Sequence, residues 1–342
     1  MPKFRFTEIA INSTEKKKPV EEDKFTYIGL EHLDSGTLTV SRWGSDIAPI
    51  GEKLVMKKGD VLFGKRRAYQ KKVGIAPFDG IFSAHGMVLR PREEVITKEY
   101  FPLFISSDYF LNEAIRISVG SLSPTVNWKD LKDLEFTIPS IEEQKRITPL
   151  IWAAIEAKNA YKEQIKCTDD LVKSQFIEMF TDTPKGKLSD IATITMGQSP
   201  DGKTYNTDGN GMPFYQGKTE FGDLYIGDAT TWTTAPSRIA EANDVLMSVR
   251  APVGSTNVAT KTCCLGRGLA GIRPIEGKST TMFILYSMRS IEDDIENMGV
   301  GSTFKAINKD VVYNLPIPIA SIELQNRFVA LAEQSDKSKF VV

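Results

Sequence analysis

Short apolar runs separated by turn residues fill the first 139 residues of the chain. Such runs occupy residues 27–30, 38–40, 60–63 and 86–89. Their length and the glycine, proline and aspartate residues around them predict short β-strands. Residues 98–117 instead carry apolar side chains at mixed helical spacings, which predicts a helical segment packed on the sheet. The pattern predicts a β-rich domain with minor helices.

A long amphipathic helix is predicted to begin after Pro139. Ser140 can cap the amide groups of the first turn, and Glu143 completes a capping-box pattern. We expect the helix to continue to Pro184, about 40 residues or roughly 60 Å. Steps of four and three residues place one stripe on a single face, which predicts a seam for a partner. The stripe is formed by Ile147, Ile151, Ala154, Lys158, Tyr161, Ile165, Thr168, Val172, Gln175 and Met179.

A stripe of this kind usually reflects packing within one domain. A helix this long between two globular modules cannot bury its stripe within either one, so we expect a partner helix or subunit. A second helix beginning near Ser321 and continuing through Phe328, Leu331 and Ala332 is the expected partner. The two would form an antiparallel coiled-coil-like spacer, in which the second helix is about half as long as the first.

The chain contains one module twice. Residues 119–147 align without a gap with residues 300–328, and 11 of the 29 positions are identical, where chance would give about two. Further matches upstream pair residues 6–10 with 188–192, 59–62 with 243–246 and 89–91 with 272–274. We therefore predict an α+β chain with two related β-rich domains separated by long helices. The predicted boundaries are 1–139 for the first domain, 140–183 for the central helix, 184–319 for the second domain and 320–342 for the distal helix.

Composition removes several classes of function. A net charge of −1 over 342 residues excludes a uniformly basic coat but allows a local basic face. Three cysteines, two of them adjacent, form neither a disulfide framework nor a zinc set, and two histidines are too few for a histidine-based metal site. No signal-peptide pattern and no membrane-spanning apolar run is found, so we expect a cytoplasmic protein.

Motifs for enzymatic chemistry are missing from the sequence. It has no phosphate-binding Gly-Lys loop, no dinucleotide-binding glycine motif and no nucleophile elbow. It also lacks a methyltransferase or nuclease constellation. We therefore expect a binding protein that is not an enzyme and that holds no metal or cofactor.

The most concentrated basic cluster directly follows residues 60–63. Five cations surround one aromatic residue, a pattern that is equally typical of a solvated hairpin tip. Lysine and arginine neutralise phosphates, and arginine also reaches base edges. The cluster therefore predicts DNA contacts by Lys65, Arg66, Arg67, Tyr69, Lys71 and Lys72.

The second copy carries a different loop at the matching place. A single arginine, Arg250, replaces the basic cluster, so the copies share a frame but are expected to have different targets. In this copy we predict DNA contacts by Lys218, Arg250 and Arg267. Three weaker candidates, which are equally consistent with structural hydrogen bonding in turns, are His85, Gln198 and Gln216. Ser121 and Ser302 in the repeated Val-Gly-Ser are weighed between a phosphate contact and a plain turn.

A set of motifs spans nearly the whole chain, at matched places in both copies. They are residues 59–62 with the arginine loop after them, 196–200, 214–217, 243–250, 315–318 followed by 321–325, and 136–139 followed by 141–147. Through these motifs the chain resembles the specificity subunits of type I restriction-modification systems.

The resemblance implies that each domain reads one half of a bipartite DNA site and that the helices set the spacer. It also implies that methyltransferase subunits dock on the helices and that restriction subunits join through them. Base flipping, methyl transfer from S-adenosylmethionine, and cleavage with ATP and Mg would belong to those partners. The expected docking side chains are Ile147, Ile151, Tyr161, Ile165, Val172, Phe328 and Leu331.

The short distal helix departs from the family pattern. A natural short form, a truncated product and a helix supplied by another chain, such as a second copy, are all consistent with it. The alternative function is a scaffold or decoy that binds methyltransferase subunits without reading DNA.

Overall fold

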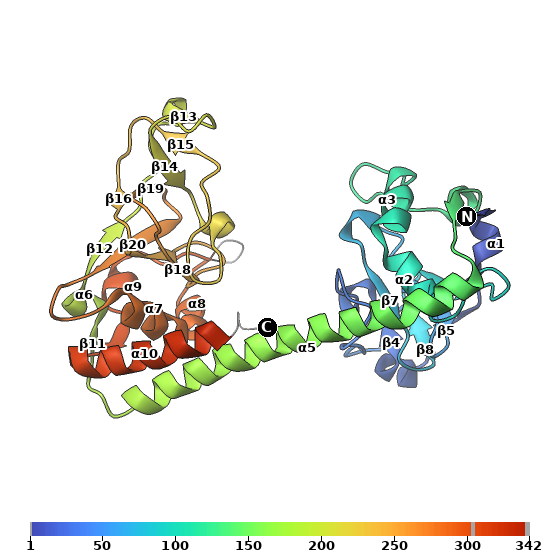
Figure 1. Cartoon of the computed structure of the whole chain (residues 1–342), viewed down its shortest axis with the longest axis horizontal. Helices are drawn as coiled ribbons and strands as arrows, with labels where there is room; N and C mark the ends of the chain where they lie inside the picture. Colours follow the sequence, from blue (N-terminus) through green and yellow to red (C-terminus); the bar gives the residue numbers. More distant parts are fainter. Residues whose placement is uncertain (1, 302–304, 339–342) are drawn as a thin grey trace. The chain divides into compact units, whose positions relative to one another are not determined.

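The computed structural model of the chain describes residues 2–301 and 305–338. The chain divides into two compact units, unit 1 (Met1–Lys158) and unit 2 (Asn159–Val342), shown in Figure 1. The long helix α5 (Ile141–Phe180) contributes its first part to unit 1 and its second part to unit 2. The predicted α+β class with two related units is confirmed.

Unit 1 is built on two four-stranded sheets. The first is antiparallel, with the order β2 (Ala10–Ser13), β9 (Met87–Pro91), β6 (Val61–Phe63) and β7 (Val73–Ile75). The second contains a parallel β4–β8 pair and has the order β3 (Lys16–Lys17), β5 (Lys53–Met56), β8 (Gly80–Phe82) and β4 (Tyr27–Ile28). A separate antiparallel pair, β1 (Lys3–Arg5) with β10 (Glu135–Thr137), joins the two ends of the first repeat copy.

Helices complete the core of unit 1. The predicted helical segment is two helices, because the chain breaks at Ser107, whose hydroxyl accepts from Phe110 N at 3.3 Å and caps the second helix. Phe110 packs on Phe63 of β6 and on Phe6, with ring centres 5.7 and 5.1 Å apart, so the predicted packing on the sheet is confirmed. The helices of this part are α1 (Phe6–Ile9), α2 (Phe101–Ser106), α3 (Asp108–Arg116) and α4 (Trp128–Leu131).

Unit 2 repeats the first sheet and elaborates the second. The antiparallel sheet has the order β12 (Ala192–Met196), β20 (Leu269–Pro274), β17 (Val245–Ser248) and β18 (Thr256–Val258). The other sheet has five strands, β13 (Tyr205–Asn206), β15 (Trp232–Thr233), β14 (Met212–Tyr215), β19 (Cys263–Leu265) and β16 (Ile239–Ala240). β11 (Lys185–Lys187) pairs with β21 (Pro316–Pro318), as β1 does with β10.

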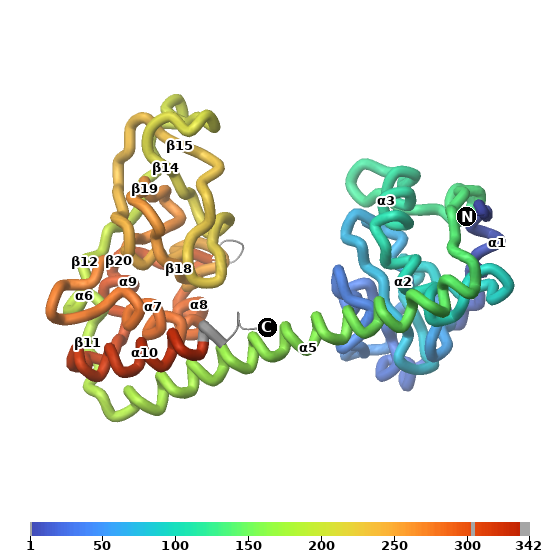
Figure 2. The backbone as a smooth tube through the Cα atoms, viewed as in Figure 1, coloured from blue at the N-terminus to red at the C-terminus, as the bar shows by residue number. Residues whose placement is uncertain are grey.

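Helices gather at the end of unit 2 opposite the five-stranded sheet (Figure 1). They are α6 (Leu188–Ile191), α7 (Thr281–Ser290), α8 (Glu292–Asn297), α9 (Lys309–Tyr313) and α10 (Ile322–Ser338). Phe328 of α10 packs on Phe176 and Phe180 of α5, with ring centres 5.1 and 5.8 Å apart. The last part of α5 and α10 therefore lie side by side and antiparallel, as Figure 2 shows.

Identical residues of the repeat make identical contacts. The buried amide of Gln144 accepts from Thr97 N at 2.7 Å and donates to the carbonyls of Val95 and Pro139, both at 2.9 Å. Gln325 makes the same three bonds in unit 2, to Thr280 N, Lys278 O and Ala320 O, at 3.1, 2.9 and 3.0 Å. The repeated glutamine therefore ties the start of α5 to the loop in front of α2, and the start of α10 to the loop in front of α7.

An ion pair between a buried aspartate and a partly exposed arginine is also duplicated. Asp60 accepts two bonds from Arg90 at 2.8 Å, and Asp244 accepts two from Arg273 at 2.9 Å. Each pair joins the start of one strand to the end of its neighbour. The matched Asp-Val-Leu and Arg-Pro motifs of the sequence are thus explained by this paired geometry.

Several local predictions are wrong. Residues 38–40 form no strand, although Leu38 and Val40 are buried, because only the Leu38 carbonyl joins the neighbouring strand, accepting from Ile75 N at 2.9 Å. The strand predicted at 27–30 is limited to Tyr27–Ile28. Ser140 does cap α5 by accepting from Glu143 N at 3.3 Å, but the Glu143 carboxylate binds Arg146 instead of closing a capping box.

The stripe predicted along α5 is displaced by one position at its ends. In unit 1 the buried side follows Gln144, Thr148 and Trp152, whereas Ile151 is 36% exposed. In unit 2 it follows Val172 and then Phe176 and Phe180, which replace the predicted Gln175 and Met179. α5 also contains a proline, Pro149, in its interior. The reason is that each unit's core, and not a continuous coiled-coil seam, selects the buried face.

Candidate nucleic-acid interface

In unit 1 the arginine loop, residues 65–72, follows β6 and is fixed by its own backbone. Arg67 and Lys71 adopt the left-handed region, with φ of 56° and 50°, on either side of a 3-10 turn at Ala68–Gln70. Arg67 N donates to Pro124 O at 2.7 Å, and Val126 N donates to Lys65 O at 2.9 Å. These backbone hydrogen bonds therefore hold the loop in one conformation, from which its side chains extend.

The exposed cations of this loop share one surface with His85. Arg66 N donates to His85 O at 3.2 Å, and Arg66 Nη1 lies 3.5 Å from His85 Nε2. Arg67 is also exposed, and its Nε donates to Ser123 Oγ at 3.3 Å. Tyr69 is 53% exposed on the same loop. The structure thus brings four of the predicted residues to one region of unit 1.

Two of the three lysines of the loop have structural partners, and the third is half-buried. Lys72 Nζ donates to Leu30 O at 2.7 Å, and Lys71 forms an ion pair with Asp108. Lys65 is half-buried, and burial, reinforced by the charge of Lys16, lowers the pKa of its amine. These contacts make the two arginines the better candidates for phosphate contacts.

Unit 2 holds Arg250 in the same frame. Arg250 follows β17 as Arg66 follows β6, and it pairs with Ala306 as Arg66 pairs with Thr125. The neighbouring bonds also match: Ala251 N donates to Lys305 O at 2.9 Å and Ile307 N to Val249 O at 3.0 Å. The Arg250 side chain is exposed. The two arginines therefore occupy equivalent positions in the two units.

A second pair of equivalent turns carries His85 and Arg267. The first precedes β9 and the second precedes β20. Arg267 N donates to Ser199 Oγ at 3.3 Å, and Gln198 N donates to Leu265 O at 3.0 Å. A Cβ on Gly268 would lie 2.3 Å from Gln216 O, so only glycine permits this approach. Gln198, Gln216 and Arg267 are thereby gathered on one exposed turn region of unit 2.

The remaining predicted lysine, Lys218, makes a contact that corresponds to the contact between Lys72 and Leu30 in unit 1. Lys218 Nζ donates to Ser255 Oγ at 3.3 Å. Ser255 precedes β18 as Lys72 precedes β7, whereas Lys218 follows β14 as Leu30 follows β4. The two units thus supply a cation to the same location from opposite segments, which illustrates how different loops diverge on one frame.

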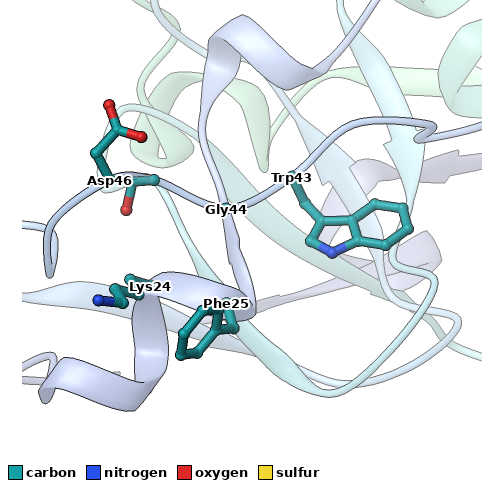
Figure 3. A pocket seen from close by; sticks show the side chains of 6 residues that line it. Lys24, Phe25, Trp43, Gly44 and Asp46 are labelled. Atoms are coloured by element: carbon teal, nitrogen blue, oxygen red, sulfur yellow. The ribbon is translucent and has the colours of Figure 1, made fainter.

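Unit 1 also contains an aromatic hollow away from the arginine loop (Figure 3). It has a volume of about 380 Å³ and is lined by Lys24, Phe25, Trp43, Gly44, Ser45 and Asp46. Phe25 and Trp43 are 66% and 49% exposed. Ile81 N donates to Thr26 O at 3.1 Å, which places the hollow beside the start of β8, whereas His85 lies beyond its end. The hollow is therefore separate from the candidate interface.

Two kinds of feature are absent from the described residues. No group of three or more His, Cys, Asp or Glu in residues 2–301 and 305–338 could hold a metal ion. In the same ranges no helix combines the length and apolar character needed to cross a membrane. Sequence reasoning missed the hairpin of residues 118–126 as a support of the arginine loop, although the repeated Val-Gly-Ser marked its position. Ser302 of that motif lies outside the described residues.

A fold built twice, with exposed arginines on matching loops, defines a protein with two related recognition domains. The family model for the type I restriction modification DNA specificity domain matches residues 6–166 and 182–339. The chain belongs to the specificity subunits of type I restriction-modification systems.

Individual relatives agree with this family. The chain is 31% identical, over 295 residues, to a putative type I restriction enzyme MjaX specificity subunit of Methanocaldococcus jannaschii, covering 78% of this chain and 69% of the relative. It is 32% identical to a chain from a structure of a type I R-M system, with a TM-score of 0.56 over 99% of this chain and 90% of the other. The type I S subunit of M. genitalium, at 14% identity and a TM-score of 0.57, covers 99% of this chain and 90% of its own and supports the fold alone. The scaffold or decoy alternative is not favoured.

Proposed function

We propose that each unit reads one half of a bipartite double-stranded DNA site. The observation that carries the proposal is the equivalence of Arg66 and Arg250, which share a backbone frame but have different neighbours. Arginines at equivalent positions can make the same phosphate contact in both units. Neighbours that differ between the units can contact different base sequences. In unit 1 the neighbours are His85 and Arg67. In unit 2 the bond from Val249 N to Gly268 O joins the segment of Arg250 to the turn of Arg267.

Catalysis is proposed to belong to partner subunits. S-adenosylmethionine would bind to methyltransferase subunits, whereas ATP and Mg would serve restriction subunits joined through them. Val172 and Phe328 are 3% and 0% exposed in the core of unit 2, so we correct the predicted docking set by removing both. Leu150 and Ile151 of α5, 65% and 36% exposed, suit a helix-docking surface better.

Three further expectations belong to this proposal. Tyr161, Ile165 and Leu331 are half-buried and stay within the docking surface together with Ile147. A second copy of the chain is an alternative occupant of that surface. The assembled complex would act on DNA in the cytoplasm.

The proposal is tested by co-expressing the chain with the methyltransferase subunit of its system and mapping methylated bases by long-read sequencing. We expect one bipartite motif. Arg66→Gln should weaken methylation through one half-site and Arg250→Gln through the other, each by roughly 10-fold. Lys58→Gln is the matched control, because Lys58 is exposed near the opposite end of β6.

Two outcomes would contradict the proposal. A complex that forms with the methyltransferase but methylates no motif would support the decoy. Equal loss from Lys58→Gln and Arg66→Gln would place the DNA elsewhere. In direct binding assays, each lost phosphate contact should also reduce the slope of log K against log salt concentration by about 0.9.

A further inference from the structure

The hairpin of residues 118–126 in unit 1 exposes aliphatic side chains at its tip. Val119 and Thr125 exchange two backbone hydrogen bonds, of 3.1 and 3.0 Å. Between them Gly120 has a φ of +120°, a conformation that favours glycine. Val119 is 66% exposed and Leu122 is 90% exposed. A fixed turn therefore holds two apolar groups in solvent.

This hairpin is joined to the arginine loop. The backbone of Arg67 donates to Pro124 and that of Val126 to Lys65, and Arg67 Nε donates to Ser123 Oγ. Any duplex that contacts the Arg67 guanidinium must therefore pass close to the hairpin, because the Arg67 side chain and the hairpin extend from one hydrogen-bonded backbone. A flexible tip would instead be independent of the loop.

In unit 2 the described residues at the base of the matching segment have the same arrangement. Val300 and Ala306 exchange backbone hydrogen bonds of 3.0 and 3.1 Å, Gly301 has a φ of +132°, and Val300 is 81% exposed. Single exposed aliphatic residues are common on protein surfaces. Here, however, an exposed valine recurs at the same place in two units whose other loops differ, each time beside an arginine.

We propose that this hairpin is a second DNA-contacting element, in which Leu122 and Val119 make apolar contacts with base edges or sugars of the duplex that the arginines hold by its phosphates. Apolar side chains contact thymine methyl groups and can also wedge between base steps. The inference rests on the proposed function and adds a specificity element to it. In unit 2, Val300 has the corresponding role.

Apolar and cationic contacts differ in their response to salt. Only contacts that neutralise phosphates release counterions, so only these set the slope of log K against log salt concentration. Loss of Leu122 should therefore lower the affinity at every salt concentration and leave the slope unchanged. Loss of Arg66 should make the slope of log K against log salt concentration less steep.

The test uses the full chain, a pool of random-sequence DNA duplexes, and the duplex that the wild-type chain enriches from that pool. We expect Leu122→Ser to bind the enriched duplex roughly 10-fold more weakly, which corresponds to burial of about one aliphatic side chain. It should also relax the base preference within one half-site only. Leu122→Met, which preserves apolar volume, should bind nearly as the wild type does. Phe25→Ser, a loss of a comparably exposed apolar side chain at the aromatic hollow, should have no effect.

The outcomes separate the inference from the proposed function. If Leu122→Ser and Val119→Thr bind the enriched duplex with unchanged affinity and select the same motif, the inference is wrong while the proposed function stands. Equal losses from Leu122→Ser and Phe25→Ser would also overturn it. If the wild-type chain enriches no motif, the proposed function itself fails. Thermal unfolding of each variant confirms that the binding data refer to folded protein.

Discussion

At the scale of single residues, identity between the two repeat copies has two different meanings. Gln144 and Gln325 are identical because each satisfies three backbone groups in a buried position. Arg66 and Arg250 are equivalent but exposed, so packing does not require them. A buried polar group is costly to leave without partners, whereas an exposed arginine is free to serve recognition.

Replacing either glutamine by alanine should destabilise its own unit. Each variant leaves two carbonyls and one amide without partners in the interior, and we expect a loss of about 1–3 kcal/mol in the free energy of unfolding. Urea denaturation with probes in each unit measures it. Lys145→Ala and Asn326→Ala are controls at exposed adjacent positions and should change stability by less than about 0.5 kcal/mol. Equal effects of variant and control would contradict a structural role.

The cysteines should differ sharply in reactivity. Cys167 is exposed, whereas Cys263 is buried and its burial, with the neighbouring Cys264, raises its pKa to about 12. A raised pKa keeps the thiol protonated, so at pH 8 only about one molecule in 10,000 would carry the reactive thiolate. Mass spectrometry after brief alkylation of the folded chain should find modification at Cys167. Comparable labelling of Cys263 would show that this sheet opens readily.

The arginines of the candidate site could be predicted from the sequence, but their supports could not. A basic run after a strand pattern identifies Arg66 and Arg67 without any structure. The bonds from Arg67 N to Pro124 and from Arg66 N to His85 join segments far apart in the chain. The Lys72 bond to Leu30 is equally non-local. Sequence composition cannot show which cation of a run has such a partner, since that depends on tertiary packing.

At the scale of helices and strands, the local periodicity of apolar residues predicts that an element exists better than it predicts where the element begins and ends. The helix after Ser140 and the strand at Val61–Phe63 follow from capping and apolar pattern. Residues 38–40 have the same apolar character, but only one backbone hydrogen bond joins them to the neighbouring strand. The buried face of α5 also differs from its predicted stripe, because Phe176 and Phe180 meet aromatic rings of α7 and α10. Those partners come from distant parts of the chain.

Pro149 makes α5 a direct test of helix energetics. A proline inside a helix has no N–H for the carbonyl four residues earlier and crowds that carbonyl. Pro149→Ala should therefore stabilise the chain, by about 1–3 kcal/mol, as measured by urea denaturation and by helical circular dichroism. Leu150→Ala, at a 65% exposed neighbouring position, is the control and should have little effect. Unchanged or reduced stability of Pro149→Ala would indicate that the proline has a required role in the helix.

At the scale of the whole molecule, duplication explains which features are shared and which diverge. Both units keep the four-stranded antiparallel sheet with its Asp–Arg pair. The second sheet differs, with four strands in unit 1 and five in unit 2. The shared sheet carries the arginine loops and the divergent sheet contributes segments such as Gln216 and Lys218. A shared sheet combined with a divergent one suits two units that bind in the same way but recognise different targets.

The length of α5 should determine the spacer between the two half-sites. Residues 156–160 are all exposed, so seven helix-favouring residues inserted there add two turns without disturbing either core. The insertion adds about 10.5 Å, equivalent to roughly three base pairs of duplex, and nearly preserves the rotational phase of the helix. Methylation mapping of the co-expressed complex should then recover both original half-sites with a spacer about three base pairs longer. The same seven residues inserted at the exposed Gly277 turn are the control and should leave the spacer unchanged. An unaltered spacer after the helix insertion would show that α5 does not act as the ruler, whereas loss of either half-site would indicate damage to a unit.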